Sequence, residues 1–185
     1  MYFAPKTITL KDGRTAILRS PLPEQDAADM LQYLVDVAAE TPFLFLAYPE
    51  ERESLTVEQE QAFLRGFLDD PIRLMMVAEV DGRIAGNCQI NFKTAIKTRH
   101  RCTVSIGLRQ AYWNLGIGTA MFQEMIDAAR RREGVVQMEL EVMEGNNRAR
   151  ALYEKMGFRI AAVHPNRVRL KDDTFLNEYL MIKEL

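Results

Sequence analysis

Cysteine, net charge and long apolar runs are all scarce in this 185-residue chain. Its two cysteines, Cys88 and Cys102, are too few for a disulfide framework and lack metal-ligand spacing, so we expect no metal site and a reducing, cytoplasmic location. The formal net charge of −2 excludes a global attraction to nucleic acid or to an anionic membrane surface. No apolar stretch approaches the roughly 20 residues of a membrane span, and the first residues do not resemble a signal peptide.

The composition is that of an ordinary globular domain, with 48% hydrophobic and 27% charged residues. The length suits one hydrophobic core, so we predict a single domain over residues 1–185. Asp12-Gly13 and Asp81-Gly82 each separate two β-prone segments and predict hairpins. Apolar residues recur at helical spacing in four segments, residues 24–40, 56–69, 116–132 and 146–156.

The order of these elements, hairpins first and then alternating strands and helices, predicts the α/β class. We expect one mixed, mostly antiparallel central sheet of about seven strands, flanked by about four helices. The second helix should bury Phe63, Phe67 and Leu68. The stretch over residues 41–53 is predicted to be an irregular loop with an apolar face.

A pair of glycines follows the strand that ends at Leu108. Gly116 and Gly118 stand where the next helix begins. A helix N-terminus presents about four unpaired amides and the positive end of the helix dipole, so it binds phosphate well. Glycine also lets the backbone approach a ligand, although close packing of a helix on its strand would use glycine too.

Two other phosphate-binding loops fit this segment less well. A dinucleotide-binding loop needs a third glycine, and Met121 occupies that position. It also needs an acidic residue at the end of the next strand, whereas Glu139 lies within that strand. The Gly-Lys-Ser or Gly-Lys-Thr of an NTPase phosphate loop is absent. A nucleotide-binding α/β protein is therefore a weaker alternative.

A second segment favours one family. It has the spacing Asn-x-x-Ala-x-x-Leu-Tyr-x-x-x-Gly-Phe, with Asn146, Ala149, Leu152, Tyr153, Gly157 and Phe158 at the fixed positions. Together with Gly-x-Gly, it resembles the GCN5-related N-acetyltransferase (GNAT) family, and the resemblance covers roughly residues 106–158. The resemblance implies the acyl-CoA N-acyltransferase fold, with acetyl-CoA as co-substrate.

The resemblance also implies how acetyl-CoA is held. Main-chain amides over residues 114–119 would bind the pyrophosphate, and the strand ending at Leu108 would pair with the pantetheine arm. The implied cofactor-binding residues are Ile106, Leu108, Trp113, Asn114, Leu115, Gly116, Ile117, Gly118, Thr119, Asn146 and Arg148.

One position of the loop departs from the family. Relatives often have Arg or Gln three residues before the first glycine, where this chain has Trp113. Main-chain amides can still bind phosphate, so the loop is expected to keep its fold. A side-chain contact to phosphate would then come from Arg109, Arg148 or Arg150.

The resemblance assigns the general acid but leaves the base open. Tyr153 matches the hydroxyl that protonates the departing thiolate, and a phenol with a pKa of about 10 stays protonated at neutral pH. A buried core tyrosine is the alternative, because the neighbouring helix positions are apolar. The strand before Gly107 lacks the glutamate that relatives often carry. Glu141 and His100 are the candidate bases, and Glu79 is a third.

The acceptor is predicted to be a small-molecule amine or an amino group of a protein or peptide. Phe43, Phe45 and Tyr48 would line its pocket, and the acidic stretch over residues 50–53 would favour a cationic amine. Direct attack by the amine is expected, because no serine or cysteine is paired with a histidine. A homodimer is also predicted, since symmetric dimers are common among soluble enzymes. The alternative function is a catalytically silent acyl-CoA-binding or regulatory domain of the same fold.

Overall fold

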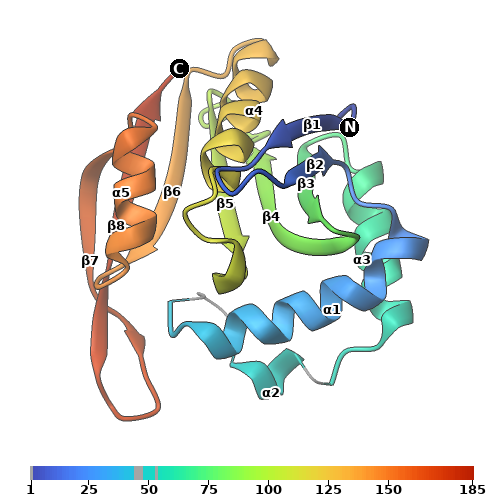
Figure 1. The fold of residues 1–185 in the computed structure, drawn as a ribbon. Helices are drawn as coiled ribbons and strands as arrows, with labels where there is room; N and C mark the ends of the chain where they lie inside the picture. Colours follow the sequence, from blue (N-terminus) through green and yellow to red (C-terminus); the bar gives the residue numbers. More distant parts are fainter. Residues whose placement is uncertain (1, 44–47, 53) are drawn as a thin grey trace.

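In the computed structural model, residues 2–43, 48–52 and 54–185 are described, and they form one sheet with helices on both faces (Figure 1). The sheet has eight strands in the order β1-β2-β3-β4-β5-β6-β8-β7. The strands are β1 (Lys6–Thr9), β2 (Thr15–Arg19), β3 (Arg73–Val80), β4 (Arg83–Phe92), β5 (Arg101–Leu108), β6 (Gln137–Met143), β7 (Arg159–Arg169) and β8 (Phe175–Glu184). The helices are α1 (Pro23–Glu40), α2 (Pro49–Arg52), α3 (Val57–Asp69), α4 (Ile117–Arg131) and α5 (Asn147–Lys155), with a 3₁₀ turn, η1 (Gln110–Tyr112), before α4.

The predicted fold class is confirmed. Every strand pair is antiparallel except β5–β6. The described residues contain eight strands and five α-helices, against the expected counts of about seven and about four. The additional helix is α2, whose four residues lie in the segment predicted to be a loop. A helix this short has no periodic pattern from which it could be predicted.

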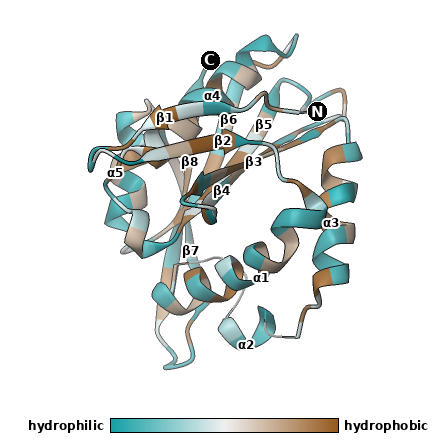
Figure 2. Cartoon of the chain, turned by 45° about the vertical axis from the view of Figure 1, so that its right-hand side comes forward, coloured by the Kyte–Doolittle hydropathy of each residue, from teal (hydrophilic) through white to brown (hydrophobic). Residues whose placement is uncertain are grey.

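Helices α4 and α5 cover one face of the sheet, and α1 and α3 cover the other (Figure 1). The main core lies under α4, where its buried side chains meet those of the central strands. Figure 2 shows much of β3 in the hydrophobic colour. The second face is covered by Ala27, Met30, Tyr33 and Val37 of α1 and by Leu64 and Phe67 of α3.

Local sequence signals place the ends of several elements. The Thr56 hydroxyl accepts a hydrogen bond from the Gln59 amide (3.3 Å), and the Gln59 side chain accepts one from the Thr56 amide (2.8 Å), which completes a capping box at α3. Asp81 and Gly82 both have positive φ (51° and 76°), as a type I′ hairpin turn requires. The prediction that Phe63 is buried is wrong. The residue is 47% exposed and lies at the edge of the stripe that α3 buries.

The one parallel strand pair is short. The β5 residues Arg101, Cys102 and Thr103 pair with the first three residues of β6. Beyond Thr103 the register with β6 ends, whereas β5 stays paired with β4 as far as Leu108. The second half of β5 therefore has main-chain groups on its β6 side without a strand partner. No helix in the described ranges combines the length and apolar character that crossing a membrane requires.

Candidate active site

The loop after β5 turns the chain into α4 through two left-handed residues. Asn114 has φ 64° and Gly116 has φ 97°, and Gly116 is the N-cap of α4. The Ala120 amide donates to the Gly116 carbonyl (3.1 Å) and begins the helical hydrogen-bond pattern. By helix geometry, the amides over residues 116–119 have no acceptor within the helix. Their partial positive charge adds to that of the helix dipole, so the mouth of α4 can bind an anion.

Glycine is required at positions 116 and 118 for two different structural reasons. At Gly116 a Cβ would meet nothing within 4 Å, so glycine is required there by its positive φ. At Gly118 a Cβ would lie 3.1 Å from Leu152 Cδ2 and 3.4 Å from Leu108 Cδ1. Gly118 therefore faces inward and allows α4 to pack closely against β5 and α5. The surroundings of the Gly118 Cα thus explain this glycine by helix packing, whereas the sequence alone predicted glycine there for the approach of a ligand.

Trp113 holds the loop from inside. Its indole Nε1 donates to the Leu108 carbonyl (2.8 Å) at the end of β5. The Arg148 guanidinium of α5 lies over the Trp113 ring, 3.8 Å from the centroid, and donates to Asn114 Oδ1 (3.2 Å). Trp113 thus replaces the Arg or Gln of relatives with a ring that places another residue's positive charge beside the α4 mouth.

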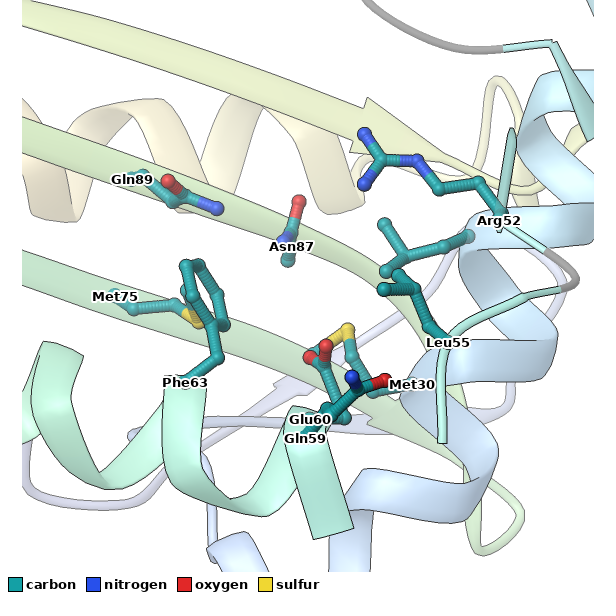
Figure 3. Close-up of a pocket in the computed structure, with 10 residues that line it drawn as sticks. Met30, Arg52, Leu55, Gln59, Glu60, Phe63, Met75, Asn87 and Gln89 are labelled. Carbon is teal, nitrogen blue, oxygen red and sulfur yellow. The ribbon is translucent and has the colours of Figure 1, made fainter. Parts of the chain in front are cut away.

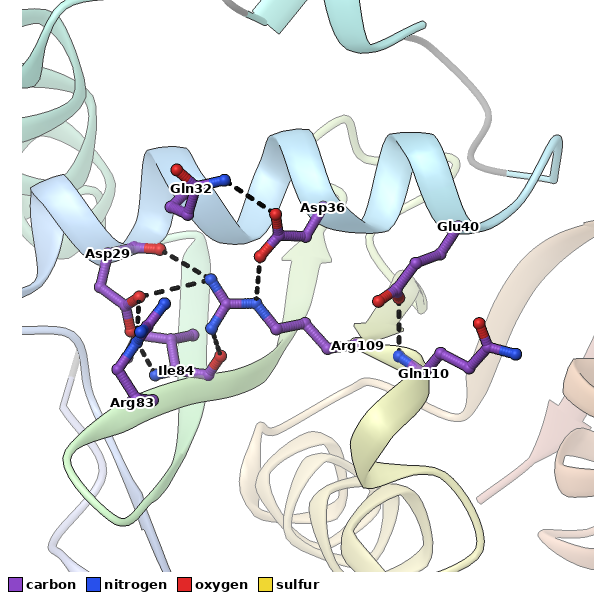
Figure 4. Close-up of polar contacts among 8 residues, drawn as sticks. All are labelled: Asp29, Gln32, Asp36, Glu40, Arg83, Ile84, Arg109 and Gln110. Carbon is purple, nitrogen blue, oxygen red and sulfur yellow. Dashed lines mark hydrogen bonds and ion pairs between the residues drawn. The ribbon is translucent and has the colours of Figure 1, made fainter.

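The other two candidate arginines are engaged elsewhere. Arg150 pairs with Glu154 on the same helix (2.8 Å). Arg109 is 6% exposed and points under α1 (Figure 4), where it donates to the Ile84 carbonyl (2.8 Å) and lies 3.0 Å from an Asp36 carboxylate oxygen. Arg109 therefore joins α1 to the end of β5 and is not available for phosphate.

Asp29 completes this junction. Its carboxylate lies 3.3 Å from Arg109 and 2.8 Å from Arg83, and it accepts the Ile84 amide. Burial disfavours the charged form of Asp29, but the Ile84 amide and the two arginines outweigh burial and hold its pKa below the usual value. Next to Arg109, the main-chain amide of Gln110 donates to the Glu40 carboxylate at the end of α1 (2.6 Å).

Helix α5 places Asn146 and Tyr153 on the same side of the sheet as α4. Asn146 is the N-cap of α5, and its side chain accepts the Ala149 amide (3.2 Å). Tyr153 is buried against Phe122 and Phe158, with ring centroids 5.3 Å and 6.3 Å apart. Burial raises the pKa of Tyr153, so its hydroxyl keeps its proton at neutral pH. No hydrogen bond to this hydroxyl is found among the described residues.

Glu141 lies on the opposite face of β6. Its neighbours Leu140 and Val142 belong to the main core, and strand alternation turns the exposed Glu141 toward the α1 side. Glu178 of β8 lies nearby and is 5% exposed. Burial and the negative charge of Glu141 raise the pKa of Glu178, against the opposing charge of Arg167 at 3.4 Å.

The structure does not bring the other candidate bases to this end of the sheet. His100 is exposed and precedes the first residue of β5, so the eight-residue strand separates it from the α4 mouth, a distance of roughly 25 Å. Glu79 pairs with Arg19 (2.7 Å), which also binds Asp26. Within the described ranges, His, Cys, Asp and Glu side chains form no group suited to a metal ion.

The residues expected to line the acceptor pocket have other contacts or lie outside the described part of the chain. Phe45 and Glu53 lie outside it. Tyr48 accepts the Lys171 amide at its hydroxyl (3.1 Å), and Lys171 also pairs with Glu50. These contacts fasten α2 to the turn between β7 and β8.

A cavity of about 300 Å³ lies instead between α1, α3 and the strands β3 and β4 (Figure 3). Glu60 of α3 faces into it and is 6% exposed. The sequence contains the signal for this residue, which was missed: Glu60 precedes Leu64 and Phe67 by four and seven positions, so it belongs to the buried stripe of α3.

Comparisons with known proteins agree with this arrangement. Residues 30–158 match the model of the acetyltransferase (GNAT) family. An N-alpha-acetyltransferase from Sulfurisphaera tokodaii is 37% identical over 93 residues, which cover 45% of this chain and 54% of that relative. An L-amino acid N-acetyltransferase from Escherichia coli is 26% identical over 115 residues, or 62% of this chain and 70% of that protein. The chain thus spans only about half the length of the archaeal relative.

Solved structures share the fold over nearly the whole chain. A GNAT-family acetyltransferase from Streptococcus pneumoniae has a TM-score of 0.82 and 28% identity, with 92% of this chain and 99% of that chain covered. A putative acetyltransferase from Salmonella typhimurium, solved with acetyl-CoA, has a TM-score of 0.75 over 91% of this chain and 92% of its own, and at 18% identity it shows the fold alone. With a family model that matches 129 of the 185 residues (30 to 158 inclusive) and an open β5–β6 pair beside the α4 mouth, this chain belongs to the GNAT acetyltransferase family.

Proposed function

We propose that this chain, as one catalytic domain over residues 1–185, transfers the acetyl group of acetyl-CoA to a primary amine. The observation that carries the proposal is the pairing of the α4 mouth with the unpaired edge of β5. The N-terminus of α4 would supply amides that bind the diphosphate of the coenzyme. The unpaired edge of β5, which lies beside it, would supply main-chain groups that bind the amides of the pantetheine arm. Membership of the GNAT family supports acetyl-CoA as the co-substrate.

The cofactor grip uses main-chain groups first. Amides from Asn114 to Thr119 would bind the pyrophosphate, and Ile106 and Leu108 would pair their main chain with the pantetheine arm. Arg148, held over Trp113, would add one positive charge at the phosphate. Asn146 caps α5, so its role would be to fix this helix beside the arm.

The chemistry needs one proton taken from the amine and one proton given to sulfur. When bound, acetyl-CoA supplies an activated thioester carbonyl. Glu141 would accept the proton of the attacking amine, directly or through water, because its carboxylate is exposed on the α1 face of the sheet, where we expect the acceptor to bind. The amine nitrogen forms the new C–N bond, the C–S bond breaks, and Tyr153 would donate its hydroxyl proton to the departing thiolate. Family relatives act on different amines by name, so a small amine and a peptide amino group both fit this step.

Tyr153→Phe tests the proposal. We expect kcat to fall by about tenfold or more with an unchanged Kd for acetyl-CoA, because the phenyl ring keeps the packing and loses only the proton donor. The measurement is steady-state turnover with a panel of amines, beside calorimetric binding of acetyl-CoA. Tight binding with no turnover of any amine by the parent protein would instead support the silent acyl-CoA-binding domain, which the absence of a glutamate from β5 favours.

A cytoplasmic location and a homodimer are further proposals. Cys88 and Cys102 are both buried free thiols, and burial raises the pKa of Cys102 to about 12, so neither is built for disulfide exchange. This fits a reducing compartment. Sedimentation of the purified protein would test the dimer.

A further inference from the structure

Half of the ten residues that line the cavity on the α1–α3 face have apolar side chains. These are Met30 and Leu34 of α1, Leu55, Phe63 of α3 and Met75 of β3. Its volume of about 300 Å³ is at the small end for ligand pockets, which suits a compact metabolite better than a folded protein surface.

Glu60 is the acidic residue in the polar half of this lining, beside Arg52, Gln59, Asn87 and Gln89. Figure 3 shows its carboxylate directed into the cavity beside Met30. Only 6% of the residue is exposed, and no hydrogen bond or close ion pair reaches the carboxylate within the described residues. Burial raises its pKa, and the charge of Arg52 partly opposes this rise. A buried carboxylate in this condition is costly unless a cation or donor binds to it.

Arg52 provides the opposite charge in the same cavity. Its Nε is buried and has no acceptor among the described residues. Figure 3 shows Arg52 and Glu60 on different sides of the cavity, with Asn87 between them in the view. A ligand that satisfies both groups must carry an anion and a cation or strong donor, separated by an apolar portion.

The sheet register orients such a ligand. The cavity residues Asn87 and Gln89 pair with Gly107 and Ser105, so this wall adjoins the part of β5 that faces the pantetheine site. Glu60 lies on α3, which packs on β3, two strands from β5. Two strand spacings amount to about 10 Å. A ligand whose reacting amine lies toward β5 therefore meets Glu60 only with a distant group, at the end of several methylenes.

We propose that this cavity binds the acceptor and selects a free basic amino acid: Arg52 binds the α-carboxylate, Glu60 binds the side-chain cation, and the α-amine points toward β5. The apolar lining accommodates the methylenes between the two charged ends. This inference rests on the proposed acetyl transfer and assigns the acceptor class of that same site.

The test compares three amines at saturating acetyl-CoA: L-lysine, L-norleucine without the terminal ammonium, and 1,5-diaminopentane without the carboxylate. We expect kcat/KM for L-lysine to exceed both others by about tenfold or more, because each missing charge leaves a buried partner unpaired. Mass spectrometry should place the acetyl group on the α-nitrogen. Acetylation at the side-chain nitrogen, or equal use of all three amines, would overturn the proposal.

Two variants assign the charges separately. Glu60→Gln should raise KM for L-lysine by about tenfold and leave L-norleucine unchanged, whereas Arg52→Gln should affect both amino acids and spare 1,5-diaminopentane. Glu58→Gln, an exposed acid on the same helix, is the matched control and should change nothing. Equal losses for every amine would mean that Glu60 has only a structural role, which contradicts the proposal.

A binding measurement separates this inference from the proposed function. L-lysine should raise the Tm of the parent protein in the presence of CoA, and Glu60→Gln should abolish that shift. Turnover of simple amines without any L-lysine effect would overturn the acceptor assignment and keep the acetyltransferase. Absence of CoA binding would overturn the acetyltransferase, and the lysine shift would then decide the cavity's role by itself.

Discussion

The two faces of the sheet differ in the kind of group that each offers a ligand. On the α4–α5 face, the loop over residues 114–119 offers main-chain amides, and β5 offers a main-chain edge. On the α1–α3 face, the cavity offers side chains, with Glu60 and Arg52 among apolar and amide neighbours. Main-chain groups bind what all acyl-CoA substrates share, whereas side chains can select one amine. In the proposals made above, the first face binds the coenzyme and the second selects the amine.

The largest expected effect tests the junction between the two faces. Arg109→Met should lower the free energy of unfolding by about 3 kcal/mol, because the Ile84 carbonyl loses its donor and the partly exposed carboxylates of Asp29 and Asp36 lose a buried cation. Urea unfolding measures this change. Arg83→Met is the matched control: Arg83 pairs with the same Asp29 but its side chain is 56% exposed, so about 1 kcal/mol or less is expected. Equal losses in the two variants would show that Arg109 is not a buried junction.

A smaller effect tests whether the α4 face depends on packing as well as on amides. Gly118→Val should lower the free energy of unfolding by about 1–3 kcal/mol, because its added methyl groups would press on Leu152 and Leu108. We expect the resulting misplacement of α4 to weaken acetyl-CoA binding as well. In the double variant Gly118→Val with Leu152→Ala, the space freed at residue 152 should restore both stability and acetyl-CoA affinity. If affinity stayed low in the double variant, the reason for glycine would be ligand approach after all.

A still smaller effect tests the proposed contribution of the Arg148 side chain to acetyl-CoA binding. Arg148→Met should raise the Kd for acetyl-CoA about threefold, because one exposed cation near the bound phosphates is lost. Isothermal calorimetry at low and high salt checks it, and the difference should shrink as salt rises. Arg150→Met, on the same helix but paired with Glu154, should bind acetyl-CoA normally. Equal weakening by both variants would argue for a general charge effect.

The smallest expected effect is a pH-dependent change in stability that tests whether the Glu60 carboxylate lacks a partner in the cavity. Because the pKa of Glu60 is raised in the folded state, its ionisation costs stability as pH rises from the unfolded value of about 4.3 through the folded one. Glu60→Gln should therefore be more stable than the parent at pH 7, and the difference should vanish toward pH 4. Thermal unfolding across this range measures it. A variant that is less stable at pH 7 would show that the carboxylate has a partner in the folded protein.

Features that depend on neighbouring residues could be predicted from the sequence, whereas features that depend on contacts between distant segments could not. The Asp81-Gly82 turn and the Thr56 capping box each depend on neighbouring residues, so local pattern was sufficient. The start of a helix at Gly116 was predicted because Gly-x-Gly follows the strand that ends at Leu108, whereas the positive φ of Gly116 comes from the structure. The packing of Gly118 and the burial of Arg109 depend on contacts between distant segments, which a local pattern does not contain.

Glu60 illustrates the remaining difficulty. Its position in the apolar stripe of α3 is visible in the sequence, but a charged residue in such a stripe usually indicates an edge of the buried face. Only the assembled cavity shows that it faces a space shared with Arg52. His100 is a similar case: its chemistry suits a base, but β5 places it at the opposite end of the strand from the N-terminus of α4, which a local pattern does not show.

The contacts of Arg109 and Gln110 with α1 have a consequence for how such a protein can diversify. These two residues begin the cofactor loop, and they bind Asp36 and Glu40 of α1. A substitution that re-angles α1 to admit a new amine would disturb the coenzyme grip at the same time. Exchanges at the cavity-facing positions Arg52 and Glu60 leave these two contacts in place, so new substrate preferences should arise there while α1 stays fixed.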